Sequence, residues 1–344
     1  MSDTPILPPL RDLPETERHM FDLQPNQGPL AGLAGSPPPA PQWFGEALAQ
    51  SPESRFVDVD GAKIHYLRWG DPAKPGVLLV HGNAAHAWWW SFIAPFLARD
   101  YHVAAMDLSG MGDSGWRAAH GEAAGYSMAR FAKEEMAVLT DAGMFEGTKA
   151  PTIVAHSFGG FVTMKAAAEY GERLSGVVII DSPVNPPTRG GDPTDHKPHP
   201  HNIYPSLAAA LARFRLMPPQ PCENLFLLDW VARKSLKEVV KPDGEFGFTW
   251  KFDPAIWRHF SIGDTAALLK ATRCRVAVFR GEHSVLMPPR IGDYIFDLLD
   301  RAAPVVEIPE ARHHVMLDQP LALVAALRAL LADWAHSVAT RRPG

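Results

Sequence analysis

The residues best suited to covalent chemistry lie near the middle of the chain, in the segment Ala155-His156-Ser157-Phe158-Gly159. The segment follows the apolar run 152–154 directly and precedes a stretch with helical spacing, which predicts a sharp strand-to-helix turn. Small residues two positions before and two positions after the serine allow such a turn to fold tightly and expose the Oγ atom. Because short motifs of this kind also arise by chance, a serine at a structural turn is the alternative. The strand and the helix on either side favour a serine nucleophile.

A second chemical signal lies upstream, where an apolar run ends in Val80-His81-Gly82-Asn83. A serine that attacks a carbonyl group creates an oxyanion, and two preorganised N–H donors are needed to stabilise it. One donor is the amide after the nucleophile and the other belongs to an earlier loop, so we expect the backbone amides of Phe158 and Asn83 to form the oxyanion hole. His81 and His86 are expected to be structural or to line a pocket, because neither lies late enough in the chain to be the base.

The general base is expected near the end of the chain, in the loop after the last strand, because serine, acid and histidine occur in that order when the serine lies on such a turn. Residues 308–315, Ile-Pro-Glu-Ala-Arg-His-His-Val, follow the apolar run 305–308 and precede a helix that starts at Pro320. Two adjacent histidines, His313 and His314, compete for the role. The residue pattern by itself leaves both open.

Together these motifs resemble the α/β-hydrolase superfamily, and the resemblance extends over about residues 55–335. The closing motif of that family has the form Pro-x-x-x-His before a short segment and a proline, and this register selects His313 as the base. His314 is then a neighbour that lines the pocket or packs. Residues 107–114, Asp-Leu-Ser-Gly-Met-Gly-Asp-Ser, are similar to the family's turn after the fourth strand, in which Asp107 and Asp113 are expected to be structural.

The triad acid is where the sequence departs from the family pattern. Relatives usually carry an aspartate three residues after the glycine that ends the seventh strand, but the segment Arg280-Gly281-Glu282-His283-Ser284 has Ser284 there. A hydroxyl cannot stabilise an imidazolium as a carboxylate does. We favour Asp181 as the acid, because it follows the apolar run 177–180 at a position that some superfamily members use. Glu282 stays open as the alternative acid, and a strand-capping role stays open for Asp181.

The elements that must position these residues alternate along the chain. Short apolar runs are typical of strands buried on both faces of a sheet, and they span residues 77–80, 103–106, 152–155, 177–180 and 276–279. Helical spacing is found in residues 127–142 and 161–170 and in a last helix, where one face carries Val324, Leu327, Leu331, Trp334 and Val338. Alternating strands and helices predict an α/β protein, here with the α/β-hydrolase fold, whose mostly parallel central sheet is flanked by helices. Ligands bind at the carboxyl ends of such strands.

Three parts are expected in the chain of 344 residues. Residues 1–53 are rich in proline and glycine and are expected to form an N-terminal arm. Residues 54–183 and 271–344 are expected to form the core, which opens with a hairpin that turns at Asp60-Gly61. Residues 184–270 show no clear buried strand, so we expect a mostly helical lid inserted after the sixth strand.

Composition argues against several classes of function. Lys and Arg number 33 against 38 Asp and Glu, for a formal net charge of -5, which argues against a nucleic-acid or anionic-membrane partner. The two cysteines lack zinc-site spacing and the N-terminus lacks an apolar secretory stretch, so we expect a cytoplasmic protein with no cofactor and no metal. A proline-rich loop rarely preorganises four ligands, so metal is also not expected at a cluster in the lid that comprises Asp192, Asp195, His196, His199 and His201. The sequence does not fix the oligomeric state.

The resemblance implies a serine hydrolase that uses Ser157, His313 and Asp181 on carboxylic esters of small or medium apolar compounds. Haloalkane dehalogenases and epoxide hydrolases of the same superfamily use an aspartate as the nucleophile, and this is absent at position 157. Hydrolysis of a carbon–carbon bond, as in meta-cleavage enzymes, of a lactone or of a thioester stays open, because these reactions use the same triad. A catalytically silent ligand-binding protein with this fold is the alternative from another class, and Ser284 adds weight to it.

Overall fold

The computed structural model describes residues 28–117, 125–147, 149–185, 200–241, 244–258 and 260–337. The chain divides into two compact units, one formed by residues 1–40 and 201–250 and the other by residues 41–200 and 251–344. Every candidate catalytic residue belongs to the larger unit. Of the cluster of acidic residues and histidines in the expected lid, residues 192–199 lie outside the described residues.

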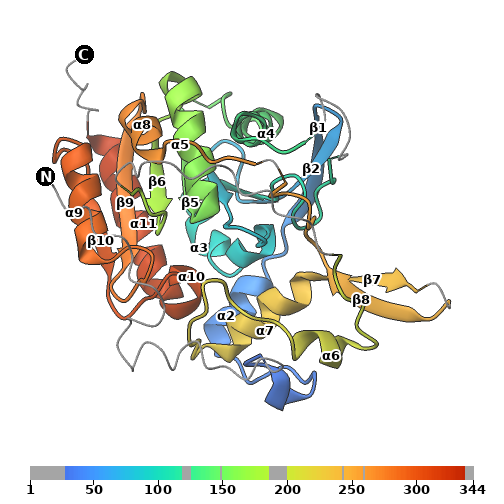
Figure 1. Cartoon of the computed structure of the whole chain (residues 1–344). Helices are drawn as coiled ribbons and strands as arrows, with labels where there is room; N and C mark the ends of the chain where they lie inside the picture. Colours follow the sequence, from blue (N-terminus) through green and yellow to red (C-terminus); the bar gives the residue numbers. More distant parts are fainter. Residues whose placement is uncertain are drawn as a thin grey trace, which may run out of the picture. The chain divides into compact units, whose positions relative to one another are not determined.

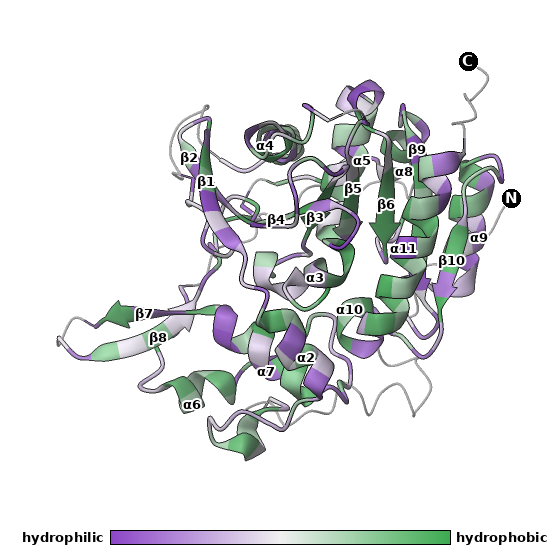
Figure 2. Ribbon diagram, turned by 180° about the vertical axis from the view of Figure 1, so that it is seen from behind, coloured by the Kyte–Doolittle hydropathy of each residue, from purple (hydrophilic) through white to green (hydrophobic). Residues whose placement is uncertain are grey.

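An eight-stranded mixed sheet forms the centre of the larger unit, with the strand order β1-β2-β4-β3-β5-β6-β9-β10. The pairs β1–β2 and β2–β4 are antiparallel, and all other neighbours are parallel. Strands β3 to β6 are buried along their whole length, and Figure 2 shows β5 and β6 as hydrophobic, which confirms the strands predicted from apolar runs. The strands are β1 (Glu53–Val59), β2 (Ala62–Trp69), β3 (Gly76–Val80), β4 (His102–Met106), β5 (Thr152–His156), β6 (Gly176–Ile180), β9 (Arg275–Gly281) and β10 (Val305–Ile308).

Helices cover both faces of this sheet (Figure 1). The apolar core on one face includes Phe131 of α4, Val162 of α5, Leu269 of α8 and Ile295 of α9. On the other face, α3 packs on β4 and contacts α11. In the described ranges, no helix is both long enough and apolar enough to cross a membrane. The helices of this unit are α2 (Gln42–Leu48), η3 (Ala87–Trp90), α3 (Ala94–Leu97), α4 (Met128–Asp141), α5 (Phe158–Tyr170), η4 (Gly171–Arg173), α8 (Thr265–Lys270), α9 (Pro289–Leu298), α10 (Val315–Asp318) and α11 (Pro320–His336).

Local sequence signals account for several of the element ends. Asp60 and Gly61 have φ angles of 50° and 79° and join β1 to β2, which confirms the two-residue hairpin predicted from the Asp-Gly step. Ser127 caps α4, because its side chain accepts a hydrogen bond from the backbone N–H of Arg130. Helix α5 begins at Phe158 rather than at Phe161, so the candidate nucleophile stands directly at the N-terminus of the helix.

Two segments differ from the expected boundaries between arm, core and lid. Residues 41–53 and 251–270 belong to the larger unit, although the sequence placed the first in the arm and the second in the lid. The ring of Phe44 in α2 packs on Phe92, with centroids 6.1 Å apart, and α8 contacts α5. Both segments bury apolar side chains on the core, which a boundary drawn from proline and glycine content does not detect. The division into arm, core and lid otherwise stays a prediction.

The smaller unit combines short helices with a two-stranded antiparallel sheet. Its helices are η2 (Ala31–Leu33), α6 (Leu207–Leu211) and α7 (Leu225–Lys234), and its strands are β7 (Leu236–Val240) and β8 (Phe246–Trp250). Residues 236–240 and 246–250 are therefore strands, which the expectation of a mostly helical segment did not include. Aromatic side chains recur at every second position of β8, which is the period of a strand and not of a helix.

Candidate active site

Ser157 stands at the turn between β5 and α5. Its backbone has φ 52° and ψ −118°, which is a strained conformation for a residue other than glycine. The N–H of Ser157 donates to the carbonyl oxygen of Ile180 at 2.9 Å, and this hydrogen bond ties the turn to the end of β6. A Cβ atom at Gly159 would lie only 2.4 Å from the carbonyl oxygen of His81, so a larger residue does not fit there. The sequence thus folds locally into the strained turn that presents a serine hydroxyl.

An unbroken chain of hydrogen bonds joins Ser157, His313 and Asp181. The Nε2 atom of His313 lies 3.0 Å from Ser157 Oγ, and its Nδ1 atom lies 2.7 Å from Asp181 Oδ1. The imidazole and the carboxylate are buried, whereas Ser157 is partly exposed. When Nδ1 carries the ring proton it donates to Asp181, and Nε2 is left to accept the proton of the hydroxyl. This arrangement activates a serine for attack on a carbonyl carbon.

Asp181 is held at the carboxyl end of β6 by groups from the next strand and loop. Its backbone has φ 49°, and its N–H donates to the carbonyl oxygen of Phe279 in β9 at 2.8 Å. The Oδ2 atom accepts a hydrogen bond from the N–H of Gly281 at 2.8 Å. The Oδ1 atom accepts one from Ser284 Oγ at 2.6 Å in addition to the one from His313. Such donors offset the desolvation cost of a buried carboxylate, which otherwise amounts to several kcal/mol.

Glu282, the alternative acid, has a different partner. Its Oε2 atom accepts a hydrogen bond from the backbone N–H of Glu310 at 2.9 Å, and its side chain is 40% exposed. The Nδ1 atom of His313 is bonded to Asp181 instead. The structure therefore brings Asp181, and not Glu282, to the imidazole.

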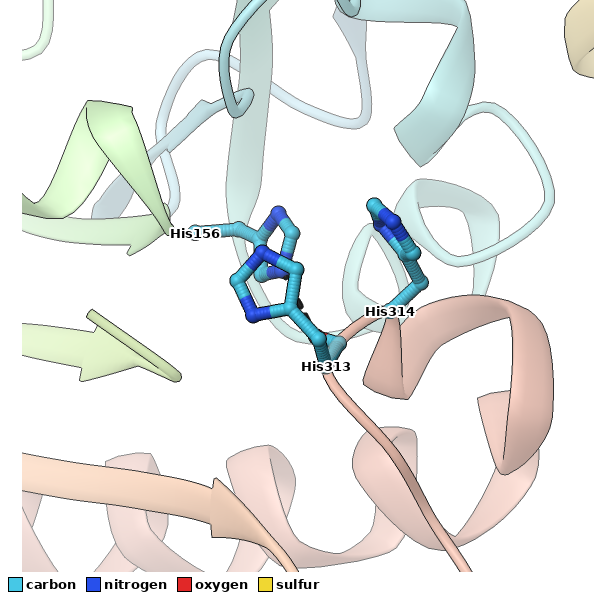
Figure 3. A group of neighbouring side chains, drawn as sticks. All are labelled: His156, His313 and His314. Atoms are coloured by element: carbon cyan, nitrogen blue, oxygen red, sulfur yellow. Dashed lines mark hydrogen bonds between the residues drawn. The ribbon is translucent and has the colours of Figure 1, made fainter. Parts of the chain in front are cut away.

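Three histidines, His156, His313 and His314, lie close together (Figure 3). His156 ends β5, whereas His313 and His314 belong to the loop before α10. The Nε2 atom of His156 donates to the carbonyl oxygen of His313 at 2.9 Å and so holds the backbone that carries the base. Burial, reinforced by the nearby His313, lowers the pKa of His156 well below its usual value, which keeps this imidazole neutral. The ring of His314 packs on Trp89 with centroids 5.5 Å apart, as a neighbour of the base.

These histidines fit hydrogen bonding better than they fit a metal. One ligand atom from each lies within 4.8 Å of the others. A metal ion would nevertheless have to displace Asp181 or Ser157 from the nitrogens of His313. Hydrogen bonds to protein groups therefore already occupy both nitrogens of His313.

The two amides expected to hold an oxyanion flank the candidate nucleophile. Phe158 is the first residue of α5, and Asn83 follows Gly82 in the loop after β3. A Cβ atom at Gly82 would lie 3.2 Å from the Cβ atom of Ser157, so this loop passes directly beside the serine. Among the described residues, no acceptor is hydrogen-bonded to either amide. Both amides are thus available to a ligand, and the N-terminal end of α5 favours negative charge there.

A second Ser-His-Asp chain, which no sequence motif indicates, lies at the β1–β2 edge of the sheet. Ser54 Oγ is 2.9 Å from His65 Nε2, and His65 Nδ1 is 2.7 Å from Asp107 Oδ2. Asp107 also accepts hydrogen bonds from the backbone N–H groups of Ala87 and Asp113, at 2.5 and 2.8 Å. Burial alone would raise the pKa of Asp107, but the hydrogen bond from His65 and the nearby imidazoles lower it to about 2. Asp107 thus anchors two loops, and its oxygens are occupied by protein donors rather than open to a metal.

His81 and His86 are buried and lie outside the hydrogen-bonded chain of Ser157. The Nδ1 atom of His81 lies 2.6 Å from the carbonyl oxygen of Gly82, and its Nε2 atom accepts from the N–H of Leu108 at 3.1 Å. Burial lowers the pKa of His81, which favours the neutral ring that these contacts need. Its contacts agree with the structural role expected for it.

Comparison with protein families gives one match that covers most of the chain. A family model described as "Alpha/beta hydrolase family" matches residues 77–327. The sheet order and the flanking helices described above agree with that match.

Curated relatives match a shorter part of the chain. The acetyltransferase component of the acetoin cleaving system of Cupriavidus necator is 35% identical over 133 residues, which cover 38% of this chain and 32% of the relative. Epoxide hydrolase A of Mycobacterium tuberculosis is 31% identical over 137 residues, which cover 40% of each chain. The chain thus spans less than half the length of these relatives.

Solved structures match over most of their length at low sequence identity. The thioesterase domain from the curacin biosynthetic pathway has a TM-score of 0.63 and 22% identity, and the match covers 81% of this chain and 99% of the domain. A novel esterase from Mycobacterium tuberculosis has a TM-score of 0.60 and 23% identity, and the match covers 88% and 95% of the two chains. At this level of identity the likeness establishes a shared fold.

Proposed function

Because the chain belongs to the α/β-hydrolase family, we propose that it is a serine hydrolase of carboxylic esters of small or medium apolar compounds. The observation that supports this proposal most is the continuous hydrogen-bonded chain from Ser157 through His313 to Asp181, which starts at a strained turn. The ester substrate class is taken from the family and from relatives named as an esterase and a lipase.

The geometry provides each step of acyl transfer to water. Ser157 Oγ attacks the carbonyl carbon while His313 Nε2 takes its proton, and Asp181 stabilises the imidazolium that forms. The amides of Phe158 and Asn83 hold the oxyanion of the tetrahedral intermediate. His313 then gives the proton to the departing alcohol. In the second half of the reaction water attacks the acyl-enzyme in the same way, and the carboxylic acid product is released. The proton that leaves with the alcohol comes from Ser157 and is replaced by one from the attacking water, and His313 carries both, so the proposal includes no cofactor.

The identity of residue 157 separates this proposal from other activities of the family. Relatives named as epoxide hydrolase and fluoroacetate dehalogenase match the chain, but epoxide hydrolases and haloalkane dehalogenases of this superfamily attack with an aspartate, whereas this chain has Ser157. A thioester is the second candidate substrate, since one structural neighbour is a thioesterase domain and the same triad serves that bond. A silent binding protein is less well supported, because Asp181 supplies the carboxylate that Ser284 lacks.

The proposed enzyme acts in the cytoplasm on a small molecule. This part of the proposal is supported by the composition and by Cys222 and Cys274, neither of which takes part in a disulfide. Residues 184–270 are proposed to act as a lid for the substrate.

The proposal is tested with nitrophenyl esters and thioesters of graded chain length, together with a fluorophosphonate that labels activated serines. We expect covalent labelling at Ser157 and turnover that is highest for short or medium acyl chains. A well-folded protein that takes up no label would contradict the proposal and would favour a ligand-binding role.

A further inference from the structure

Ser284 occupies the position at which the family pattern has its acid. Its hydroxyl contacts the carboxylate of Asp181, which is proposed to be the acid in this chain. The side chain is 4% exposed, and its Oγ atom donates to Asp181 Oδ1 at 2.6 Å. The same oxygen accepts the hydrogen bond from His313 Nδ1. We infer that Ser284 is a positioning residue that fixes the carboxylate of Asp181 with Oδ1 facing His313. This inference rests on the proposed function.

The direction of the Ser284 hydroxyl is set by its own surroundings. The backbone N–H of Met287 donates to Ser284 Oγ at 3.1 Å, so one lone pair of the oxygen is occupied. The hydroxyl proton is then directed at Asp181, the other hydrogen-bond partner of this oxygen. An oxygen that accepts one hydrogen bond becomes a stronger donor in the next, because the two bonds polarise each other.

The orientation of the carboxylate depends on donors at both of its oxygens. Gly281 N–H binds Oδ2, whereas Ser284 and His313 bind Oδ1. Among the described residues, removal of the Ser284 hydroxyl leaves His313 as the single donor to Oδ1. The hydrogen bond between His313 and Asp181, which must strengthen when the imidazolium forms, then loses the neighbour that fixes its acceptor. A hydrogen bond to a charged group is roughly twice as strong as one between neutral groups, so its loss is expected to lower the rate about tenfold.

The loop that carries Ser284 is itself held in place. The N–H of Ser284 donates to the carbonyl oxygen of Gly281 at 3.1 Å, and Arg280 Nε donates to the carbonyl oxygen of Met287 at 2.9 Å. The loop after β9 therefore helps to position Asp181 against the imidazole of His313, although the loop does not carry the triad acid. In this chain the charge comes from the end of β6, and the loop contributes the donors that orient it.

A purely structural role for the hydroxyl is the competing explanation, and a double-mutant cycle separates the two. The rate constant for fluorophosphonate labelling of Ser157 and the kcat for a nitrophenyl ester are measured for wild type, Ser284→Ala, Asp181→Asn and the double variant. If Ser284 acts through Asp181, Ser284→Ala lowers both rates about tenfold in the wild-type background with little change in KM. In the Asp181→Asn background the same substitution then changes them less than about twofold.

Ser114 provides a matched control for the loss of a buried hydroxyl. Its Oγ atom also accepts from a backbone N–H, that of His65, and donates to an oxygen, the carbonyl of Asp107. Ser114→Ala is expected to lower the thermal midpoint about as much as Ser284→Ala without lowering the labelling rate of the folded protein. The inference would be overturned if Ser284→Ala lowered the labelling rate and kcat equally in the wild-type and Asp181→Asn backgrounds, or in neither. Labelling of Ser157 in the wild type would still support the proposed enzyme in that case. Absence of labelling in the wild type would overturn the proposed function together with the inference.

Discussion

The larger unit contains two Ser-His-Asp chains whose hydrogen-bond distances hardly differ. The serine-to-imidazole distances are 3.0 Å for Ser157 and 2.9 Å for Ser54, and both imidazole-to-carboxylate distances are 2.7 Å. Only the surroundings of the two serines distinguish them. Ser157 stands at a strained turn, and among the described residues no acceptor is hydrogen-bonded to the amides of Phe158 and Asn83, whereas Ser54 lies within the β1–β2 ladder opposite Leu67.

The difference teaches that three aligned side chains do not make a catalytic site on their own. Under the proposed function, a carbonyl substrate at Ser157 would find amides for its oxyanion at the N-terminus of a helix, and such donors supply much of the rate of acyl transfer. The backbone at Ser54 belongs to a regular antiparallel ladder, which forms no such hole. The acids differ as well, since Asp107 accepts two backbone N–H groups that anchor loops, whereas Asp181 is oriented by Gly281 and Ser284.

The largest expected effect comes from removing each serine in turn. Ser157→Ala should abolish fluorophosphonate labelling and lower ester hydrolysis by about a thousandfold or more, because the nucleophile is lost. Ser54→Ala should change kcat by less than about twofold, because that hydroxyl faces no oxyanion hole. Labelling on a gel and initial rates with nitrophenyl acetate measure both. If the Ser157→Ala protein were still labelled, Ser157 would not be the reactive serine, and the proposed difference between the two Ser-His-Asp chains would be wrong.

Replacing each acid should separate catalysis from stability. Asp181→Asn should lower kcat by about three to four orders of magnitude, because the imidazole loses its orienting charge. Asp107→Asn should instead lower the free energy of unfolding by about 3 kcal/mol, because backbone donors lose their buried acceptor, while kcat per folded molecule stays within about tenfold. Urea unfolding followed by tryptophan fluorescence and rates corrected for the folded fraction measure the two effects.

Glu282→Gln serves as the control for this pair of acids. Its carboxylate accepts a backbone N–H and lies 3.9 Å from His283 Nε2 at an exposed position, and a glutamine oxygen can accept the same N–H, so kcat should change less than about twofold. A large loss of kcat in this variant, with Asp181→Asn still active, would assign the acid to Glu282.

The smallest effect is a pH dependence of stability that belongs to Asp107. Burial alone would raise its pKa, but the hydrogen bond from His65 and the nearby imidazoles lower it to about 2, from an ordinary 3.8. A lowered folded-state pKa stabilises the protein above pH 4, and this contribution of about 2 kcal/mol is lost as the pH falls from 4 to 2. Unfolding free energies measured at pH 5 and pH 3 should therefore fall more steeply in wild type than in Asp107→Asn. Equal slopes would show that Asp107 does not provide this contribution.

Much of the fold and of the Ser157 chain could be predicted from the sequence because the signals are local. Strands buried on both faces are unbroken apolar runs, as at 152–155 and 177–180, and the strained turn needs small neighbours such as Gly159. The position of His313 came from the register of a family motif, and that of Asp181 from the end of an apolar run at which some superfamily members carry their acid.

The parts that could not be predicted depend on contacts between residues far apart in the chain. Ser284 and Asp181 are 103 positions apart, and His65 and Asp107 are 42 positions apart, so their hydrogen bonds follow from sheet order and strand register rather than from spacing. Strands β7 and β8 were missed because each is short and partly exposed, so neither forms the unbroken apolar run from which the buried strands were predicted.

The separation of the base from its acid has a consequence for biosynthesis. His313 is made 132 residues after Asp181, and at about 5–20 residues per second this interval lasts on the order of ten seconds. During that time the nascent chain carries Ser157 without the imidazole that activates it. Under the proposed function, the hydroxyl is activated only after the final loop has left the ribosome and joined the sheet.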